Sequence, residues 1–354
     1  MTRPAVRDDL VALEGYHSPQ LDVDVRLNTN ESPLPPPPEF VAELREAVGD
    51  IRWNRYPDRA ATALRKGLAE RHGVDPGQVF VANGSNEVLQ TVLLTFAGAG
   101  RRVLTFEPTY AMHSQIARTS GATVVSRDRL ADFSLDASGV LSAMEVADPA
   151  VTFLCSPNNP TGMAEPADLI AEVLDHGRGL LVVDEAYGEF AERSAVDLLG
   201  EEVPLVVTRT YSKVWSMAAM RLGYMIGPRW LVAELDKVVL PYHLDALKQR
   251  AGMLALGHAA DMESRVAELV ESRRSLVSAL SGLDVEVWPS QANFVLFRPR
   301  RLPGRDVWQG LVDRSVLVRD CSSWPRLENC LRVTVGSRPE NERFLSSLEE
   351  VLAP

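Results

Sequence analysis

The chain has 354 residues, of which 45% are hydrophobic and 24% charged, and it carries a formal net charge of −11 at pH 7. This length allows two domains with a sizeable core. The acidic balance argues against nucleic acid as the main partner, because phosphate backbones attract basic surfaces. No apolar run is long enough to span a membrane, and the opening MTRPAVRDDL lacks the apolar core of a signal peptide. We therefore expect a cytoplasmic protein without a membrane partner.

Cysteine and histidine are too few and too scattered to suggest a metal centre. The six histidines form no HExxH pair, and the three cysteines have no metal-ligand spacing. An odd number of cysteines favours buried thiols in a reducing compartment over a disulfide framework. We predict no metal site, and we expect Cys155, Cys321 and Cys330 to be buried.

The first 38 residues are polar and rich in turn formers, with a short strand expected at 23–27. Four consecutive prolines at 35–38 forbid a helix and favour an extended linker. We therefore expect residues 1–38 to form an N-terminal arm. Helical periodicity begins near residue 39, and a second amphipathic helix is expected after Pro57.

From residue 78 onward, strands alternate with stretches of helix length. The runs QVFVANG, RVLTFEP, AVTFLCSP, LLVVDEAY, PLVVTRTYSK and LGYMIG are almost uniformly apolar. Such runs predict an α/β fold with a mainly parallel sheet sandwiched by helices. We assign this large domain to residues 39–245. In such sheets ligands bind at the carboxyl ends of the strands.

A smaller α+β domain is expected at residues 246–354. A long helical region covers roughly residues 243–280, and the runs VEVWPS, ANFVLFRP, VLVRD and CLRVTVG then alternate with helical segments. This mixture of strands and helices differs from the regular alternation before it. The boundary is placed within 240–250.

The stretch LVVTRTYSKVWSMAAMRLGYMIG suggests the chemistry. It places Lys213 after an apolar strand, with Thr210 and Ser212 before it and Arg221 eight residues later. A buried lysine can form a Schiff base with an aldehyde, and hydroxyl and guanidinium groups bind phosphate. The pattern suits pyridoxal 5′-phosphate. Taken alone, the stretch is better explained as an ordinary lysine in a loop after a strand.

Polar residues follow other predicted strands as well. Asp184 ends an apolar run, and a buried carboxylate needs a cationic partner. A pyridinium nitrogen could supply that partner, and so could one of the many arginines. Tyr187 could reach the phenolic oxygen of the same ring, and Tyr110 could stack on its face. In SPNNPTG, an amide of Asn158 or Asn159 could donate to that oxygen, although a plain turn explains the motif too.

A third motif, ANGSNEVLQ, places Gly84, Ser85 and Asn86 where a strand passes into a helix. Free N–H groups at a helix N-terminus suit a phosphate, although an ordinary N-capped turn is the alternative. The chain contains no GxGxxG or GxxxxGK[ST] motif, so neither a dinucleotide fold nor a P-loop competes with this interpretation.

Together these motifs resemble the aspartate-aminotransferase superfamily of pyridoxal phosphate enzymes, and within it most closely the histidinol-phosphate aminotransferases. The resemblance covers nearly the whole chain. It depends on RLNTNESP, RYPDR, ANGSNEVLQ, EPTYAMH, SPNNPTG, VDEAYGEF, RTYSKVWSMAAMRLGY and LRVTVGSRPEN. It implies a fold type I homodimer that exchanges an amino group between L-histidinol phosphate and 2-oxoglutarate, by ping-pong kinetics, in histidine biosynthesis.

The resemblance also implies roles for single residues. Lys213 would form the Schiff base and carry a proton, Asp184 would pair with the ring nitrogen, and Arg332 would bind a carboxylate. The remaining cofactor contacts would come from Gly84, Ser85, Asn86, Tyr110, Asn159, Tyr187, Thr210, Ser212 and Arg221, with Tyr56 from the neighbouring subunit; the remaining substrate contacts would come from Arg319, Tyr16, Tyr56 and Asn30.

Two departures from the family pattern leave alternatives open. Trp215 and Met217 add bulk after the lysine, where we expect them to serve packing. The loop CSSWPRLENC between Arg319 and Arg332 is longer and more aromatic than usual, and its RDC is also similar to threonine-phosphate decarboxylases. An aromatic or broad-range aminotransferase is the first alternative and such a decarboxylase the second. A non-catalytic ligand sensor would need a DNA-binding module, which the sequence does not indicate.

Overall fold

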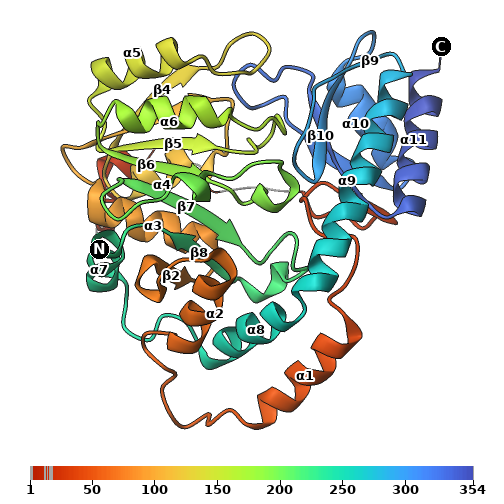
Figure 1. The fold of residues 1–354 in the computed structure, drawn as a ribbon. Helices are drawn as coiled ribbons and strands as arrows, with labels where there is room; N and C mark the ends of the chain where they lie inside the picture. Colours follow the sequence, from red (N-terminus) through yellow and green to blue (C-terminus); the bar gives the residue numbers. More distant parts are fainter. Residues whose placement is uncertain (1–2, 12, 14, 16–18, 354) are drawn as a thin grey trace.

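The structure is a computed structural model that describes residues 3–11, 13, 15 and 19–353. A seven-stranded sheet has the order β2-β8-β7-β6-β5-β3-β4, and a second, five-stranded sheet has the order β1-β11-β12-β10-β9. In Figure 1 the first sheet lies to the left, and the second lies to the right with the C-terminal helices. The strands are β1 (Val25–Leu27), β2 (Val79–Ala82), β3 (Arg102–Glu107), β4 (Thr123–Asp128), β5 (Val151–Cys155), β6 (Leu180–Asp184), β7 (Leu205–Thr210), β8 (Gly223–Ile226), β9 (Val285–Val287), β10 (Phe294–Pro299), β11 (Val316–Asp320) and β12 (Leu331–Thr334).

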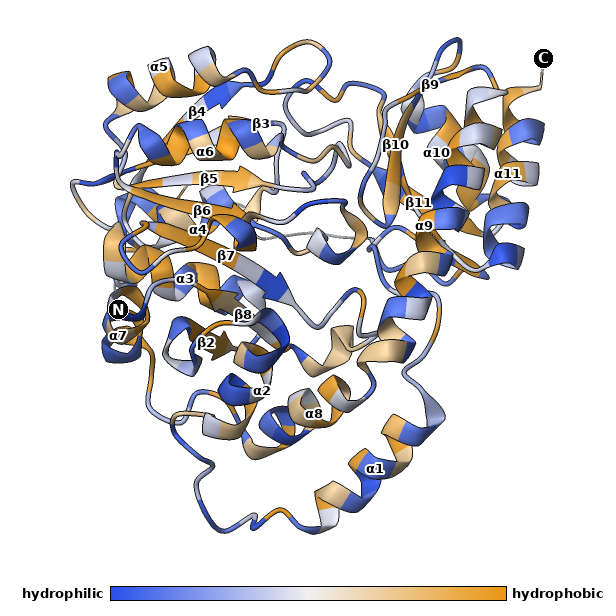
Figure 2. Ribbon diagram, viewed as in Figure 1, coloured by the Kyte–Doolittle hydropathy of each residue, from blue (hydrophilic) through white to orange (hydrophobic). Residues whose placement is uncertain are grey.

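Helices cover both faces of the large sheet, because its strands are apolar on both sides. Along β6, Leu180 and Val182 join the cluster under α3, α4 and α7, whereas Leu181 and Val183 join the cluster under α5 and α6. Figure 2 shows β5, β6 and β7 as hydrophobic ribbons between helices with mixed faces. The helices are α1 (Pro38–Gly49), α2 (Thr62–His72), α3 (Ser85–Phe96), α4 (Met112–Thr119), α5 (Ala137–Ala147), α6 (Ala167–Asp175), α7 (Arg229–Val238), α8 (Ala246–Gly257), α9 (Ala259–Ser281), α10 (Gly304–Val312) and α11 (Arg338–Leu352).

The predicted α/β class with a mainly parallel sheet is confirmed. Strands β4, β3, β5, β6 and β7 pair in parallel, whereas β8 is antiparallel to both β7 and β2. The predicted long helical region is divided at His258 into α8 and α9. As expected, all three cysteines are buried.

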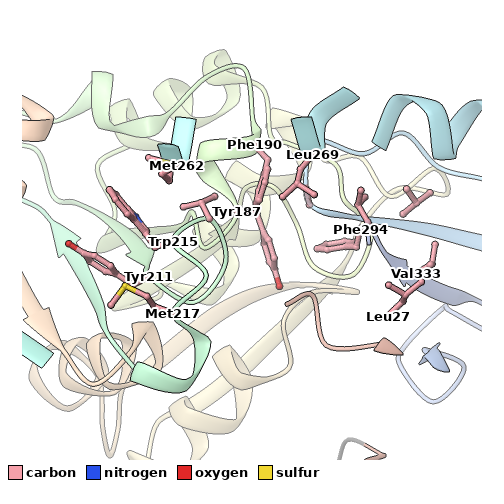
Figure 3. Close-up of a cluster of buried hydrophobic side chains, with 14 of the residues drawn as sticks. Leu27, Tyr187, Phe190, Tyr211, Trp215, Met217, Met262, Leu269, Phe294 and Val333 are labelled. Atoms are coloured by element: carbon pink, nitrogen blue, oxygen red, sulfur yellow. The ribbon is translucent and has the colours of Figure 1, made fainter. Parts of the chain in front are cut away.

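The domain boundaries at residues 38 and 245 stay a prediction, and two contacts cross them. Strand β1 of the N-terminal arm pairs in parallel with β11, so the arm completes the small sheet. Helix α8 packs against α1 and α2 on the side of the large sheet. One continuous core cluster joins both parts: Figure 3 shows Tyr211, Trp215 and Met217 together, and Leu27, Phe294 and Val333 further along the same cluster. The two parts therefore share apolar packing beside the polar strand ends.

Candidate functional site

A cavity of about 400 Å³ lies at the carboxyl ends of β5, β6 and β7. Its walls come from the large sheet, the N-terminal segment Thr29–Glu31 and the small domain. Most of the residues singled out from the sequence lie in this lining: Asn30, Ser85, Asn86, Tyr110, Asn159, Asp184, Tyr187, Thr210, Ser212, Lys213, Arg221, Arg319 and Arg332.

Lys213 follows β7, and its side chain reaches the cavity. The Nζ atom donates to the backbone oxygen of Thr29 over 3.0 Å and lies 5.8 Å from the ring centroid of Tyr187. Burial is the main cause that lowers the pKa of this amine to about 7; the nearby charges of Arg332 and Arg221 act in the same direction, and that of Glu31 opposes them. The amine is therefore available in its neutral, nucleophilic form near neutral pH.

Asp184 ends β6 as a buried carboxylate held on both oxygens. Its Oδ1 accepts from the Thr208 hydroxyl at 3.0 Å and from the Ala186 backbone N–H at 3.1 Å, and its Oδ2 lies 2.8 Å from His113 Nε2. Among the described residues, the basic side chain that contacts this carboxylate is that of His113 and not of an arginine. These three contacts fix the orientation of the carboxylate toward the cavity.

His113 is a site residue that we did not single out from the sequence. It is fully buried on α4, its ring stacks on Phe153 at 4.5 Å, and Tyr110 meets it edge-on at 5.4 Å. Within the described part of the chain its Nδ1 has no hydrogen-bond partner. His113 stands three positions after Tyr110 in the motif EPTYAMH. Residues three apart lie on the same side of a helical turn, and this spacing could have indicated that His113 faces the same site as Tyr110.

Polar groups gather at the corner where β8 meets the start of α3. Arg221 Nη1 donates to Ser212 Oγ over 3.2 Å, and its Nη2 would lie 2.8 Å from a Cβ added to Gly84. Gly84 has φ +83°, which favours glycine, and a Cβ on Gly223 would come within 2.3 Å of the Ser85 nitrogen. The corner therefore combines a guanidinium, hydroxyls and a helix N-terminus, the groups that bind phosphate in proteins.

Two tyrosines also line the cavity. Tyr187 OH accepts from Asn30 Nδ2 over 2.9 Å, and burial raises its pKa to about 12. Tyr110 lines the cavity and donates to Asn86 Oδ1 over 3.3 Å. Asn158 lies outside the lining and is fully buried; it bonds to Thr109 and Thr161, which supports the interpretation as a turn for this asparagine.

The opposite wall carries two arginines on paired strands. Arg319 of β11 lies opposite Arg332 of β12 in the antiparallel register. Arg332 is 5% exposed; it donates to Asn159 Oδ1 over 2.5 Å and to the Asn28 carbonyl over 2.8 Å. Two guanidinium groups side by side suit an anionic ligand.

Two predicted contacts, those of Tyr16 and Tyr56, are not found among the described residues that line this cavity. Tyr16 lies outside the described residues. Tyr56 is 80% exposed and stacks on Tyr242 at 4.5 Å, away from the cavity of its own chain. Trp215 and Met217 are buried in the core cluster and do not line the cavity, which agrees with the packing role expected for them.

Comparison with known proteins identifies the family. The family described as aminotransferase class I and II matches residues 23–348. The histidinol-phosphate aminotransferase of Thermobifida fusca is 44% identical over 97% of this chain and 94% of its own length, and that of Corynebacterium diphtheriae is 41% identical over 98% and 96%. The chain belongs to the class I and II aminotransferases.

Solved structures of this aminotransferase fold superpose along nearly the full length. The histidinol-phosphate aminotransferase of Sinorhizobium meliloti in complex with pyridoxal-5′-phosphate has a TM-score of 0.85 at 24% identity, covering 93% of this chain and 91% of that one. An aspartate aminotransferase variant of Thermus thermophilus has a TM-score of 0.83 at 21% identity, covering 98% and 99%. The fold type I architecture expected from the sequence is thereby confirmed.

Pyridoxal phosphate, the cofactor of this family, fits the residues present. The corner at Gly84, Ser212 and Arg221 matches its phosphate, the buried carboxylate of Asp184 matches its ring nitrogen, and Lys213 supplies an amine for its aldehyde. Among the described residues, no cluster of three possible metal ligands occurs, and no helix is long and apolar enough to span a bilayer.

Proposed function

We propose that the protein transfers an amino group between L-histidinol phosphate and 2-oxoglutarate, giving imidazole acetol phosphate and L-glutamate. The observation that carries the proposal is that Arg319 and Arg332, which are paired across two strands, line the same cavity as Lys213. A guanidinium group can form two parallel hydrogen bonds with either a phosphate or a carboxylate, so one site can serve two substrates in turn. The names and identities of the curated relatives support this choice of substrate.

Pyridoxal phosphate, when bound, would supply the electron sink that stabilises negative charge on the substrate Cα. Lys213 would attach the cofactor and afterwards accept and return the Cα proton, which its lowered pKa favours. Asp184 would keep the ring nitrogen protonated through a charge-assisted contact. Asn159 and Tyr187 would hold the phenolic oxygen, with Tyr110 against the ring.

The phosphate of the cofactor would be held by groups from three segments. The start of α3 offers backbone N–H groups at Ser85 and Asn86, and β7 and the turn after it offer hydroxyls at Thr210 and Ser212. Arg221 adds the positive charge. Lys213 lines the same cavity as these phosphate-binding groups.

We also propose a cytoplasmic homodimer in which Tyr56 of one chain completes the cofactor site of the other. Tyr56 cannot serve its own cavity from its place in the structure, and the neighbouring Trp53 is 71% exposed. An aromatic surface of this kind is typical of protein interfaces. Sedimentation should give twice the mass of one chain, and a monomer with full activity would refute the shared site.

The substrate is tested by a donor screen at the half-reaction in which the donor loads the cofactor with its amino group. Histidinol phosphate should be the fastest donor, with glutamate second. Faster conversion of phenylalanine would favour an aromatic aminotransferase. Release of carbon dioxide from threonine phosphate would indicate a decarboxylase instead.

A further inference from the structure

The small domain presents three side chains to the cavity among the described residues, and one of them has no part in anion binding. Arg319 and Arg332 are the charged pair; the third is Trp324. It comes from the loop Cys321–Cys330 between β11 and β12. A partly exposed indole next to two guanidinium groups is an apolar wall at the anion-binding end of the cavity.

The loop has a defined structure that fixes the place of Trp324. The two ends of the loop are joined by a hydrogen bond in which the Cys321 backbone N–H donates to the Cys330 carbonyl over 3.0 Å. Within it, the Trp324 N–H donates to the Cys321 carbonyl over 3.0 Å, and the Leu327 N–H donates to the Trp324 carbonyl over 3.2 Å. Cys321, Leu327 and Cys330 are fully buried in a cluster with Phe133, and Trp324 packs against this cluster.

Two anchors tie the loop to its surroundings. At one end, Asn329 Oδ1 accepts from the Gly304 N–H over 2.9 Å at the start of α10. Near its middle, the Arg326 guanidinium donates across to the large domain, to the carbonyls of Arg129 and Leu130. Arg326 makes this contact from the left-handed region, at φ +64°. Such a conformation persists only where its surroundings hold it.

The platform that Arg326 reaches is itself rigid. The Arg129 side chain is buried, pairs with Glu165 at 2.7 Å, and donates to the carbonyls of Phe106 and Phe133 over 3.2 Å and 3.1 Å. The hydrogen bonds of Arg326 thus attach the loop 321–330 of the small domain to a well-packed segment of the large domain. This attachment keeps the indole of Trp324 at the cavity.

We propose that Trp324 is a specificity-determining residue that contacts the planar ring of an amino donor whose anionic group is bound by Arg319 and Arg332, and that Arg326 is its positioning residue. The proposal rests on the aminotransferase function proposed above. Aromatic pairs gain energy beyond their buried area, whereas the short aliphatic chain of glutamate offers little to an indole. Trp324 therefore favours ring-bearing anionic donors over glutamate.

The test compares Trp324→Ala with the wild type on histidinol phosphate and on glutamate. We expect kcat/KM for histidinol phosphate to fall about tenfold, mainly through KM, while glutamate changes less than about twofold. Trp324→Phe should retain most of the preference. Trp230→Ala, on α7 and away from the cavity, is the matched control and should leave both donors unchanged. Equal losses with both donors, or no loss, would overturn the proposal.

The outcome separates this inference from the proposed function. A wild type that converts phenylalanine but not histidinol phosphate refutes the substrate, and the Trp324→Ala effect is then measured on phenylalanine against glutamate with the same expectations. A wild type that accepts neither ring-bearing donor overturns both proposals.

Arg326 is tested by a split between KM and kcat. Arg326→Ala should raise KM for histidinol phosphate several-fold, because the substitution frees the loop that carries Trp324. It should leave kcat for glutamate unchanged, because Arg326 contacts no reacting atom. Arg326→Lys should restore part of the loss, since an ammonium can still donate to a carbonyl. Arg301→Ala removes an exposed arginine that pairs with Asp284 and serves as the control. Equal effects on both donors would reduce Arg326 to a merely structural role.

Discussion

The two walls of the cavity are built in different ways. On the side of the large sheet, Asp184, Thr210 and Ser212 sit at or just beyond the ends of buried parallel strands, and their positions are set by the sheet itself. On the side of the small domain, long side chains such as Arg319, Trp324 and Arg332 reach in from two short antiparallel strands and the loop between them. Groups that need fixed geometry for chemistry come from the rigid wall, and groups that recognise substrates come from the wall on which a loop can vary.

The N-terminal segment lies between the walls and contacts both. The Thr29 carbonyl accepts from Lys213, the Asn28 carbonyl accepts from Arg332, and the Asn30 side chain donates to Tyr187. Because β1 pairs with β11, this segment is fixed to the small sheet. The comparison therefore predicts that substitutions on the side of the large sheet slow the reaction with every donor, whereas those on the side of the small domain weaken the binding of substrates.

The largest effect is expected at Lys213. Lys213→Ala should lower kcat by roughly 10³ to 10⁴-fold, because both the amine that attaches the cofactor and the proton carrier are lost. Borohydride reduction should fix the cofactor on the wild type and on the control Lys237→Ala, whose lysine pairs with Glu234 on the surface. Label recovered on any other residue would refute the assignment.

The next largest effect is expected at Asp184. Asp184→Asn keeps the shape but removes the charge, so the half-reaction rate with either donor should fall by roughly 10² to 10³-fold. Asp245→Asn, which alters an exposed helix cap, is the matched control and should retain full activity. A loss of less than twofold at Asp184 would mean that the carboxylate does not face the ring nitrogen.

The substrate wall should respond selectively. Arg319→Gln should weaken histidinol phosphate by roughly 10- to 100-fold and glutamate far less, because a phosphate gains more from a second guanidinium. Arg332→Gln should weaken both donors, since both present an anion to it. Comparable losses for the two donors in Arg319→Gln would show that Arg319 does not bind the substrate phosphate. They would also contradict the proposed difference between the two walls of the cavity.

The smallest expected effect is a pH dependence. Since burial lowers the pKa of Lys213 to about 7, the amine is mainly protonated below that pH and mainly neutral above it. Only the neutral amine attacks an aldehyde, so the rate at which apoenzyme binds pyridoxal phosphate covalently should rise with pH through about 7. Stopped-flow absorbance measures this rate, and Lys213→Ala gives the baseline. A midpoint near the ordinary lysine value would contradict a buried amine.

Much of the site was predictable because its residues follow local patterns. An apolar run that ends in a polar residue identifies a strand end, and strand ends of a parallel sheet meet at one edge. Asp184, Thr210, Lys213 and Arg332 were found in this way or by resemblance, and all line one cavity. The uniformly apolar runs, such as the one that forms β6, likewise predicted a sheet covered on both faces.

Contacts between distant segments were decided only by the tertiary structure. His113 meets Asp184 across 71 positions, the Asn28 carbonyl meets Arg332 across 304, and the antiparallel β8 adds its strand between β7 and β2. Arg326 reaches the large domain in the same way. A sequence fixes the period and the ends of each element through short-range sterics and hydrophobicity, but which side chains meet depends on strand order and domain docking, to which the whole core contributes.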